Sequence, residues 1–538
     1  MSQRIPTGVR GAKIVLTGSA TEMSDYNNSH FAAFTAGFPK WLIPLWLPRK
    51  KLYPPVQKNH NGTAKYAPYG LRKVEAVLLE KGFEESDIAI VHPYDLDAFV
   101  GSNTKVVGIS TMDPLGMGYV SKTYSSLIGG GGSLNSIEFC RLVAHKSLQK
   151  YGPKIIVGGA GAWQLEYENM IERYGIDCVV MGECETIVSE LFAKALKGEE
   201  LPKVIRVETG VKNGEIPAIK HAAIHGFVEI SRGCGRNCQF CTPTTRRRRD
   251  FPVNKIMEEV EVNVREGADL ISLSTEDIFL YGAKNNSFIP NKEAVLKLLK
   301  QISSHPGVKA IQPAHMSLAP VVYDPIMVKE ISEILIEHSF YRFNGKPIVT
   351  AETGIETGST RLIRKYMAGK TLPYKPEEWQ ELVCQAFGIL NDCNWYPLAT
   401  LIIGLPDETE DDTEETLELL DDLGKYRAFL VPLLFIPLEN CFLKSQRGAD
   451  LDSFSKLRWE LLTDCWKFNI RVWKSSFLES QFHNSFFRNV ITGFFLPLTG
   501  LVSGLYYWEK HGKIVRDAIW NVTGLVNKNG EEEAQDNV

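Results

Sequence analysis

Three cysteines gathered in one short stretch are the residues of this chain best suited to bind a metal. Cys234, Cys238 and Cys241 have the spacing Cys-x3-Cys-x2-Cys and follow a strand-like segment. A structural zinc site usually has four protein ligands, but the next cysteine downstream is Cys384. Three thiolates can hold three irons of a [4Fe–4S] cube and leave the fourth iron open to another molecule. A zinc site completed by a distant ligand, or three unrelated buried thiols, are the alternatives.

Four consecutive arginines, Arg246–Arg249, follow the cysteines. We expect them to open a helix that continues into residues 252–262. One hypothesis is that they contact a phosphate or carboxylate, since guanidinium groups bind both in a bidentate manner. The alternative is ordinary salt bridges to nearby acidic residues, which we favour for at least two of the four.

The elements that must position the cysteines belong to a run of alternating strands and helices that begins near residue 226. Continuous apolar strands that alternate with helices favour parallel β-structure. Six such units predict a parallel barrel, a partial (β/α)6 rather than a complete one. The expected strands cover residues 226–233, 269–275, 308–316, 346–356, 397–406 and 429–438.

The first 200 residues show a separate alternating pattern, with helices predicted over 69–83 and 133–152. The pattern predicts an α/β, doubly wound, Rossmann-like sheet, whose ligands bind at the carboxyl ends of the strands. The strands are predicted over 12–19, 87–93, 105–114, 154–162 and 178–185. The candidate ligand contacts at these ends are Ser110, Thr111, Gly158, Gly159, Gly182, Glu183 and Glu185.

Composition limits the classes of function. The 538 residues carry a formal net charge of -4, so no overall basic field favours nucleic acid, and we expect no nucleic-acid partner. Ten cysteines are too sparse for a disulfide scaffold, and the N-terminus has no secretory signal pattern. We therefore expect a reducing, cytoplasmic location.

The C-terminal region contains an apolar stretch, residues 489–508, without a charged residue. Its length and its aromatic end suggest peripheral membrane contact or a channel for an apolar substrate. A helical cap packed on the barrel is the alternative.

The sequence predicts three domains. They are residues 1–205, residues 206–445 and a helical region, 446–538.

With Phe240 before the last cysteine, the cysteine motif resembles that of the radical S-adenosylmethionine (SAM) superfamily. The resemblance covers about residues 226–440 and implies that Cys234, Cys238 and Cys241 hold a [4Fe–4S] cluster whose open iron chelates SAM. It further implies an external one-electron donor of the ferredoxin or flavodoxin type. Three later segments, 273–277, 352–359 and 402–409, match family motifs in order. The SAM contacts that the resemblance implies are Phe240, Glu276 (with Asp277 as the second choice), Glu356, Thr357, Gly404 and Glu408.

A doubly wound domain before such a barrel is similar to the cobalamin-binding class of the superfamily. The resemblance implies cobalamin at the strand ends of the first domain. One departure is that the Asp-x-His-x-x-Gly motif of other cobalamin proteins is absent, and His92 is a poor substitute for its histidine. An empty structural domain is the alternative.

The resemblance predicts an enzyme that cleaves SAM to a 5'-deoxyadenosyl radical and modifies an unactivated carbon of a small molecule or lipid. Cobalamin-dependent C-methylation is the leading prediction. The rivals are cobalamin-free C–C bond or ring formation on a membrane lipid, and a non-catalytic iron–sulfur protein.

Overall fold

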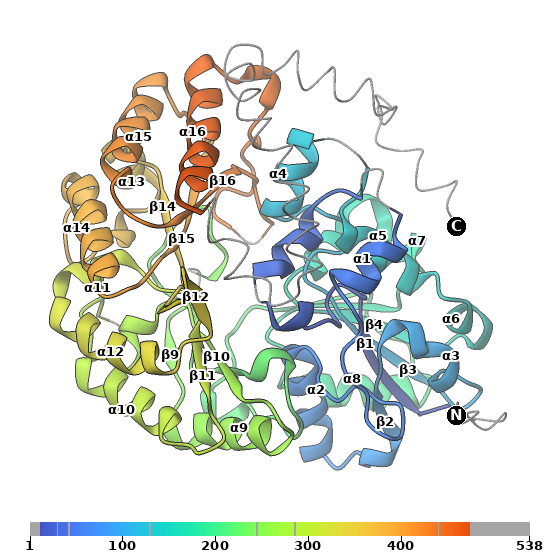
Figure 1. Ribbon diagram of the computed structural model, residues 1–538. Helices are drawn as coiled ribbons and strands as arrows, with labels where there is room; N and C mark the ends of the chain where they lie inside the picture. Colours follow the sequence, from blue (N-terminus) through green and yellow to red (C-terminus); the bar gives the residue numbers. More distant parts are fainter. Residues whose placement is uncertain are drawn as a thin grey trace. The chain divides into compact units, whose positions relative to one another are not determined.

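The computed structural model describes residues 11–29, 31–40, 44–128, 131–243, 246–284, 287–439 and 441–473. These residues form two compact units (Figure 1). The first unit contains the described residues up to Gly226 together with 261–267. The second contains residues 227–260 and the described residues from 268 onward.

The first unit is built on one parallel sheet with the strand order β2-β1-β3-β4-β5-β6. The buried, apolar strands agree with the predicted doubly wound α/β fold, which is confirmed. The order reverses between β1 and β3, so their carboxyl ends form the switch point at which such sheets bind ligands. The strands are β1 (Ile14–Gly18), β2 (Ile88–Ile90), β3 (Val106–Ser110), β4 (Lys154–Gly158), β5 (Cys178–Gly182) and β6 (Val204–Val207).

Helices cover both faces of this sheet. Side chains of α2 (Tyr69–Glu80) and α8 (Val188–Leu196) pack in one core, and those of α5 (Leu134–Val143) and α6 (Lys146–Tyr151) pack in another. The single helix predicted over 133–152 is wrong. The chain breaks at Ala144–His145, where the His145 ring nitrogen Nδ1 accepts the Ser147 N–H and begins a new helix.

The sixth strand lies beyond the five strands that the sequence pattern predicts for the first domain. β6 pairs with β5 in parallel from Val179↔Val204 to Gly182↔Val207. The first unit therefore continues through β6 to Gly226.

The second unit contains two parallel three-stranded sheets, ordered β7-β10-β11 and β14-β15-β16. A parallel bridge between His315 and Glu352 connects β11 to β14. The six strands thus follow one another in chain order, and the predicted partial barrel is confirmed. They are β7 (Phe227–Glu229), β10 (Leu270–Ser274), β11 (Ala310–Pro313), β14 (Glu352–Glu356), β15 (Leu398–Ile403) and β16 (Phe429–Leu434).

Amphipathic helices separate these strands and bury one face each against them (Figure 1). The last described helix is held to β16 by Asn469, whose amide bonds both the N–H and the C=O of Leu430. The helices are α9 (Val253–Arg265), α10 (Lys292–Ser303), α11 (Leu318–Tyr323), α12 (Pro325–Glu337), α13 (Thr360–Tyr366), α14 (Trp379–Asp392), α15 (Glu410–Leu423) and α16 (Lys456–Trp473).

Within the described residues, no helix has the length and apolar character needed to cross a membrane. The predicted membrane-contact stretch, 489–508, lies outside the described residues.

A steric test of the first unit uses Gly159, which follows β4 with φ +100°. A Cβ added there would lie 2.5 Å from the Thr111 carbonyl oxygen. We expect Gly159→Ala to lower the free energy of unfolding by about 2 kcal/mol or more, through backbone strain and the clash together. The loss of unfolding free energy is measured by urea unfolding, with hydrogen exchange of the β3 and β4 amides as the probe.

The matched control is Gly175→Ala. Gly175 also has a positive φ, +63°, but no atom lies within 4 Å of an added Cβ. It should therefore cost only about 1 kcal/mol of backbone strain. Equal losses in the two variants would contradict close packing of the 111–112 loop against Gly159.

Candidate cofactor site

The cysteine segment is a loop held closed by a short antiparallel hairpin. β8 (Ser231–Arg232) enters it and β9 (Arg249–Asp250) leaves it, with Ser231 opposite Asp250. The Cys234 N–H donates to the Arg246 carbonyl at 3.2 Å. Gly233 allows the close approach, because its φ is +80° and a Cβ would lie 2.6 Å from the Arg247 carbonyl oxygen.

The arginine run forms the return side of this hairpin and does not begin a helix, so that prediction is wrong. α9 begins only at Val253. Arg248 is buried and donates to the carbonyls of Ala283 and Ser287, both at 3.3 Å. Hairpin pairing, rather than a helical turn, provides the backbone partners of Arg249 and Asp250.

The three thiols of the loop interact electrostatically. Burial is the main cause that raises the pKa of the Cys234 thiol, to about 11, and of the Cys241 thiol. Cys238 adds to the pKa of both, and Cys234 adds to that of Cys241, since neighbouring thiolates repel one another. None of the three cysteines is part of a disulfide. The thiols would therefore ionise readily only beside a partner that supplies positive charge.

A guanidinium group inside the motif ties the loop to the barrel. Arg236, only 5% exposed, donates to the carbonyls of Gly369 (2.9 Å) and Lys370 (3.2 Å). It also donates to the Ser317 hydroxyl at 2.8 Å and the Asp277 carboxylate at 3.3 Å. Its cationic carbon lies 4.6 Å from the centre of the Phe288 ring. The loop is thus connected to the segments that follow β10, β11 and α13.

A buried ion pair lies beside the thiols. The Lys370 ammonium is 3.0 Å from the Glu356 carboxylate, and the Thr400 hydroxyl donates to the other oxygen of Glu356 at 3.2 Å. Burial raises the pKa of the Cys238 thiol; the Lys370 charge lowers it, and the Glu356 charge raises it. The predicted contacts Glu356 and Glu276 therefore both lie within electrostatic range of the cysteines.

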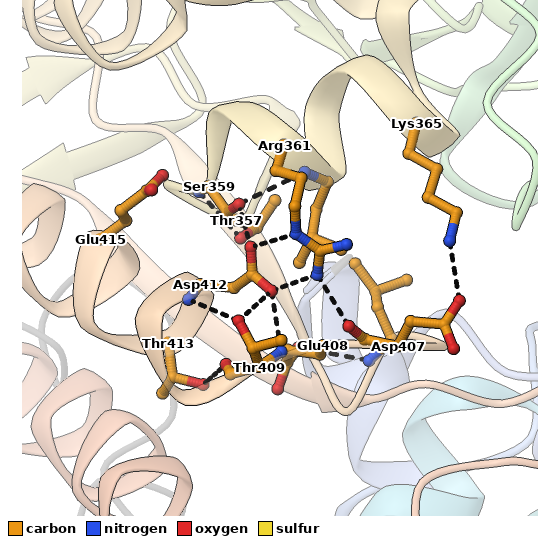
Figure 2. Close-up of polar contacts among 12 residues, drawn as sticks. Thr357, Ser359, Arg361, Lys365, Asp407, Glu408, Thr409, Asp412, Thr413 and Glu415 are labelled. Atoms are coloured by element: carbon orange, nitrogen blue, oxygen red, sulfur yellow. Dashed lines mark hydrogen bonds and ion pairs between the residues drawn. The ribbon is translucent and has the colours of Figure 1, made fainter.

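Two other predicted SAM contacts belong to a different polar network (Figure 2). The Thr357 hydroxyl is 2.9 Å from that of Thr416. The Glu408 carboxylate accepts the N–H groups of Gly404 and Leu405 and pairs with Arg458 at 2.8 Å. These side chains therefore stabilise the turn between β15 and α15, and their contact with SAM stays a prediction.

The same network fixes the start of α15. Asp412 accepts hydrogen bonds from Ser359, Arg361 and Thr409 (Figure 2). Burial opposes ionisation, but these donors together hold the pKa of Asp412 well below its usual range. A charged capping box thus aligns α15 with the segment after β14.

The residues around the thiols fit an iron–sulfur cluster. Thiolate sulfur is the ligand that such clusters use, and two buried cations, Arg236 and Lys370, favour the charged form of the Cys238 thiol. Among the described residues, no three His, Cys, Asp or Glu side chains converge closely enough to hold a single metal ion. A cluster places its irons at separate points, so its ligands need not converge on one point.

The first unit offers a second candidate edge, at the switch point between β1 and β3. The Glu22 carboxylate accepts the Met112 N–H at 3.0 Å and the Thr111 hydroxyl at 3.4 Å. Burial raises the pKa of Glu22 to about 7. The side chain of Met112 remains 66% exposed at this edge. A large, partly apolar ligand matches this combination.

The predicted glycines of this edge have mainly an internal role. Gly182 approaches the Val207 carbonyl, which would be 2.4 Å from an added Cβ. Glu183 accepts the Val211 N–H at 2.8 Å. Gly158 has open space, with no atom nearer than 3.7 Å to an added Cβ. His92 is buried and accepts the Tyr94 N–H, as expected for a capping histidine.

The sequence analysis did not identify Arg236, His315, Lys370 or Glu22 as site residues. The position of Arg236 between two motif cysteines was the one available signal. Lys370 lies far from the cysteines in sequence, and only the folded barrel brings it near them. His315 likewise meets Glu276 and Glu352 only in the folded barrel.

Residues 228–420 match the family model of the radical SAM superfamily. This segment is therefore a radical SAM domain, which uses a [4Fe–4S] cluster and SAM. The cysteine loop, β10, β14 and β15 all lie within the matched segment.

Curated relatives match about half of this chain. The chain is 26% identical over 271 residues to tRNA-2-methylthio-N(6)-dimethylallyladenosine synthase of Thermotoga petrophila, a match that covers 50% of this chain and 56% of that one. It is 29% identical to the enzyme of the same name from Bacteroides fragilis, over 55% of this chain and 60% of that one. The chain thus spans somewhat more than half the length of these relatives.

Solved structures extend the likeness to the first unit. TsrM from Kitasatospora setae, a radical SAM methyltransferase solved with tryptophan substrate and a SAM analogue, matches with a TM-score of 0.52. The match covers 80% of this chain and 75% of TsrM at 14% identity, so it is a likeness of fold.

Arg236→Ala tests the tie between the cysteine loop and the barrel. It leaves the buried Asp277 carboxylate without its cation, which we expect to cost about 3–5 kcal/mol of stability. We also expect fewer irons per chain after anaerobic reconstitution, because the loop loses four hydrogen bonds. Thermal unfolding and iron analysis measure the two effects.

Arg247→Ala is the control within the same loop, since Arg247 is exposed. It should change stability by no more than about 0.5 kcal/mol and leave iron content unchanged. If the two variants behave alike, Arg236 does not hold the loop.

Proposed function

We propose that this protein is a radical SAM enzyme that methylates an unactivated carbon, with Cys234, Cys238 and Cys241 as ligands of its [4Fe–4S] cluster. The observation that carries the proposal is the cysteine loop, closed by the β8–β9 hairpin and tied by Arg236 to the strand ends of a radical SAM domain. When bound and reduced by an external one-electron donor, the cluster supplies the electron that cleaves SAM to methionine and a 5'-deoxyadenosyl radical.

The protein's own groups bind and orient the cofactor in this proposal. Glu276, after β10, accepts the SAM ammonium. Glu356, which is paired with Lys370 in this structure, would contact the ribose or the methionyl group. Phe240, 7% exposed, directly precedes Cys241 and would shield the cluster from water.

The first unit is proposed to bind cobalamin at the β1/β3 edge. When bound there, methylcobalamin supplies the methyl group. The strand order, the exposed Met112 and the fold likeness to TsrM, which was also solved with cobalamin bound, support this assignment. Its proposed contacts are Ser110, Thr111, Gly158, Gly159, Gly182, Glu183 and Glu185.

A second candidate is methylthiolation of tRNA, the activity in the names of the curated relatives. The sequence identity of these relatives to this chain favours methylthiolation of tRNA. The net charge of -4, in contrast, provides no overall attraction for a polyanion such as tRNA. Cobalamin-free C–C bond or ring formation on a lipid is a third candidate, without a supporting feature among the described residues. A non-catalytic iron–sulfur protein is the alternative to all three enzymes.

The cluster is tested by anaerobic reconstitution. We expect about four irons per chain, and formation of 5'-deoxyadenosine from SAM after reduction. Replacing Cys234, Cys238 or Cys241 by alanine should abolish both. Cys384→Ala is the control, since Cys384 lies on α14 as an ordinary free thiol. A parent protein that forms no deoxyadenosine would refute the radical SAM activity.

The class of chemistry is tested by corrinoid binding. After incubation with hydroxocobalamin and gel filtration, we expect about one corrinoid per chain by absorbance. Absence of bound corrinoid would favour the other two candidates. Deletion of the gene, followed by mass comparison of metabolites, lipids and tRNA nucleosides for a missing methyl or methylthio increment, then separates all three.

A further inference from the structure

Three ionisable side chains lie together at neighbouring strand ends of the barrel. Glu276 follows β10, His315 follows β11, and Glu352 opens β14. The His315 ring nitrogen Nδ1 is 3.1 Å from the Thr275 carbonyl oxygen, and Nε2 is 3.2 Å from a Glu352 carboxylate oxygen. Backbone bonds between the 314–316 segment and Glu352 hold this geometry.

The partners of the His315 ring define its protonation state. A carbonyl oxygen only accepts, so Nδ1 must carry a hydrogen. Nε2 faces a carboxylate, which also only accepts when ionised, so the ring is satisfied when both nitrogens are protonated. Burial opposes this charge, but Glu352 and Glu276 outweigh it and raise the pKa of His315 to about 9.

The charges around Glu276 do not cancel. Glu229 pairs with Arg232 at 2.7 Å, and Asp277 pairs with Arg236 at 3.3 Å. Within the part of the chain that the structure describes, His315 is the cation that both Glu276 and Glu352 interact with. Two carboxylates and one imidazolium leave one negative charge.

That residual charge is accessible to a ligand. The side chain of His315 is 42% exposed and that of Glu352 is 30% exposed. Solvent therefore reaches both side chains, although the surrounding protein desolvates the His315 ring. Glu276 is also partly accessible. Burial raises the pKa of Glu276, the His315 charge opposes this rise, and Glu352, Asp277 and Glu229 add to it. His315 is therefore the group that favours an ionised Glu276.

We propose that His315 is a positioning residue: it occupies Glu352 with its own charge and so leaves Glu276 free to pair with the ammonium group of SAM. The inference rests on the proposed function, in which Glu276 receives that ammonium. With SAM bound, the site then holds two carboxylates and two cations, each in its own pair.

The proposal predicts that Glu352 and His315 act as a unit. In Glu352→Gln the imidazolium keeps only Glu276 as a partner and competes there with the SAM ammonium. In the double variant Glu352→Gln/His315→Gln, one positive and one negative charge are removed together, and Glu276 again carries the single free charge. A purely structural role would make the double variant worse than the single one.

The experiment measures equilibrium binding of SAM to the full chain after anaerobic reconstitution. We expect E352Q to weaken SAM binding by about tenfold or more, and the double variant to return to within about threefold of the parent. His338→Gln is the control, since His338 lies at the end of α12 and its Nδ1 bonds a backbone carbonyl of the same helix. It should not change SAM affinity.

Several outcomes would overturn the proposal. They are an unchanged SAM affinity in E352Q, or a double variant that binds SAM as weakly as E352Q at equal iron content.

If E352Q does not load iron, the single variant H315Q tests the proposal. Its SAM affinity should fall from about pH 8 to about pH 6, because Glu276 then lacks the His315 charge that opposes the rise of its pKa and takes up a proton more readily. The parent affinity should change less over that range, and parallel pH profiles would refute the inference. A parent that binds no SAM would instead refute the proposed function, and this inference with it.

Discussion

The guanidinium of Arg236 is the interaction on which the arrangement of the cofactor site depends. It belongs to the cysteine loop, yet its hydrogen bonds end on residues after β10, β11 and α13. A loop of this kind has few apolar contacts of its own and could adopt many conformations. Four charge-assisted or backbone-directed bonds from one planar group restrict it to one position relative to the strand ends. The thiols therefore face the same edge of the barrel as Glu276 and Glu356.

Paired charges are the second organising feature of the barrel interior. Lys370 with Glu356, Arg232 with Glu229 and Arg236 with Asp277 each combine a buried cation with a carboxylate. Such pairs are poor sources of net stability, since desolvation offsets their attraction. Their value lies in specificity, because an unpaired charge in this environment is costly and so attracts an opposite charge from a ligand. The unequal group of Glu276, His315 and Glu352 is the one that leaves a charge available.

The predictable part of the fold was the part that local pattern controls. Apolar strands such as Ile14–Gly18 and Leu270–Ser274 are buried on both sides, so their hydrophobic runs indicated parallel sheets in both units. Two local interpretations were wrong because tertiary contacts decided the backbone. The 133–152 segment breaks where His145 caps a second helix, and the arginine run pairs with β8 instead of forming a helix. A side-chain cap in the first case, and the backbone pairing of a hairpin in the second, outweighed helix propensity.

The sequence by itself determined the chemistry at one point, the three cysteines, because metal ligation depends on residue type and short spacing along the chain. It also determined that strand ends would carry Glu276 and Glu356. Only the tertiary structure decided which charges lie beside them. Lys370, His315 and Glu352 are distant in sequence from the cysteines, and strand order alone brings them together. Electrostatic energy depends on distance in space and on burial, and neither quantity is written in the spacing of residues along a chain.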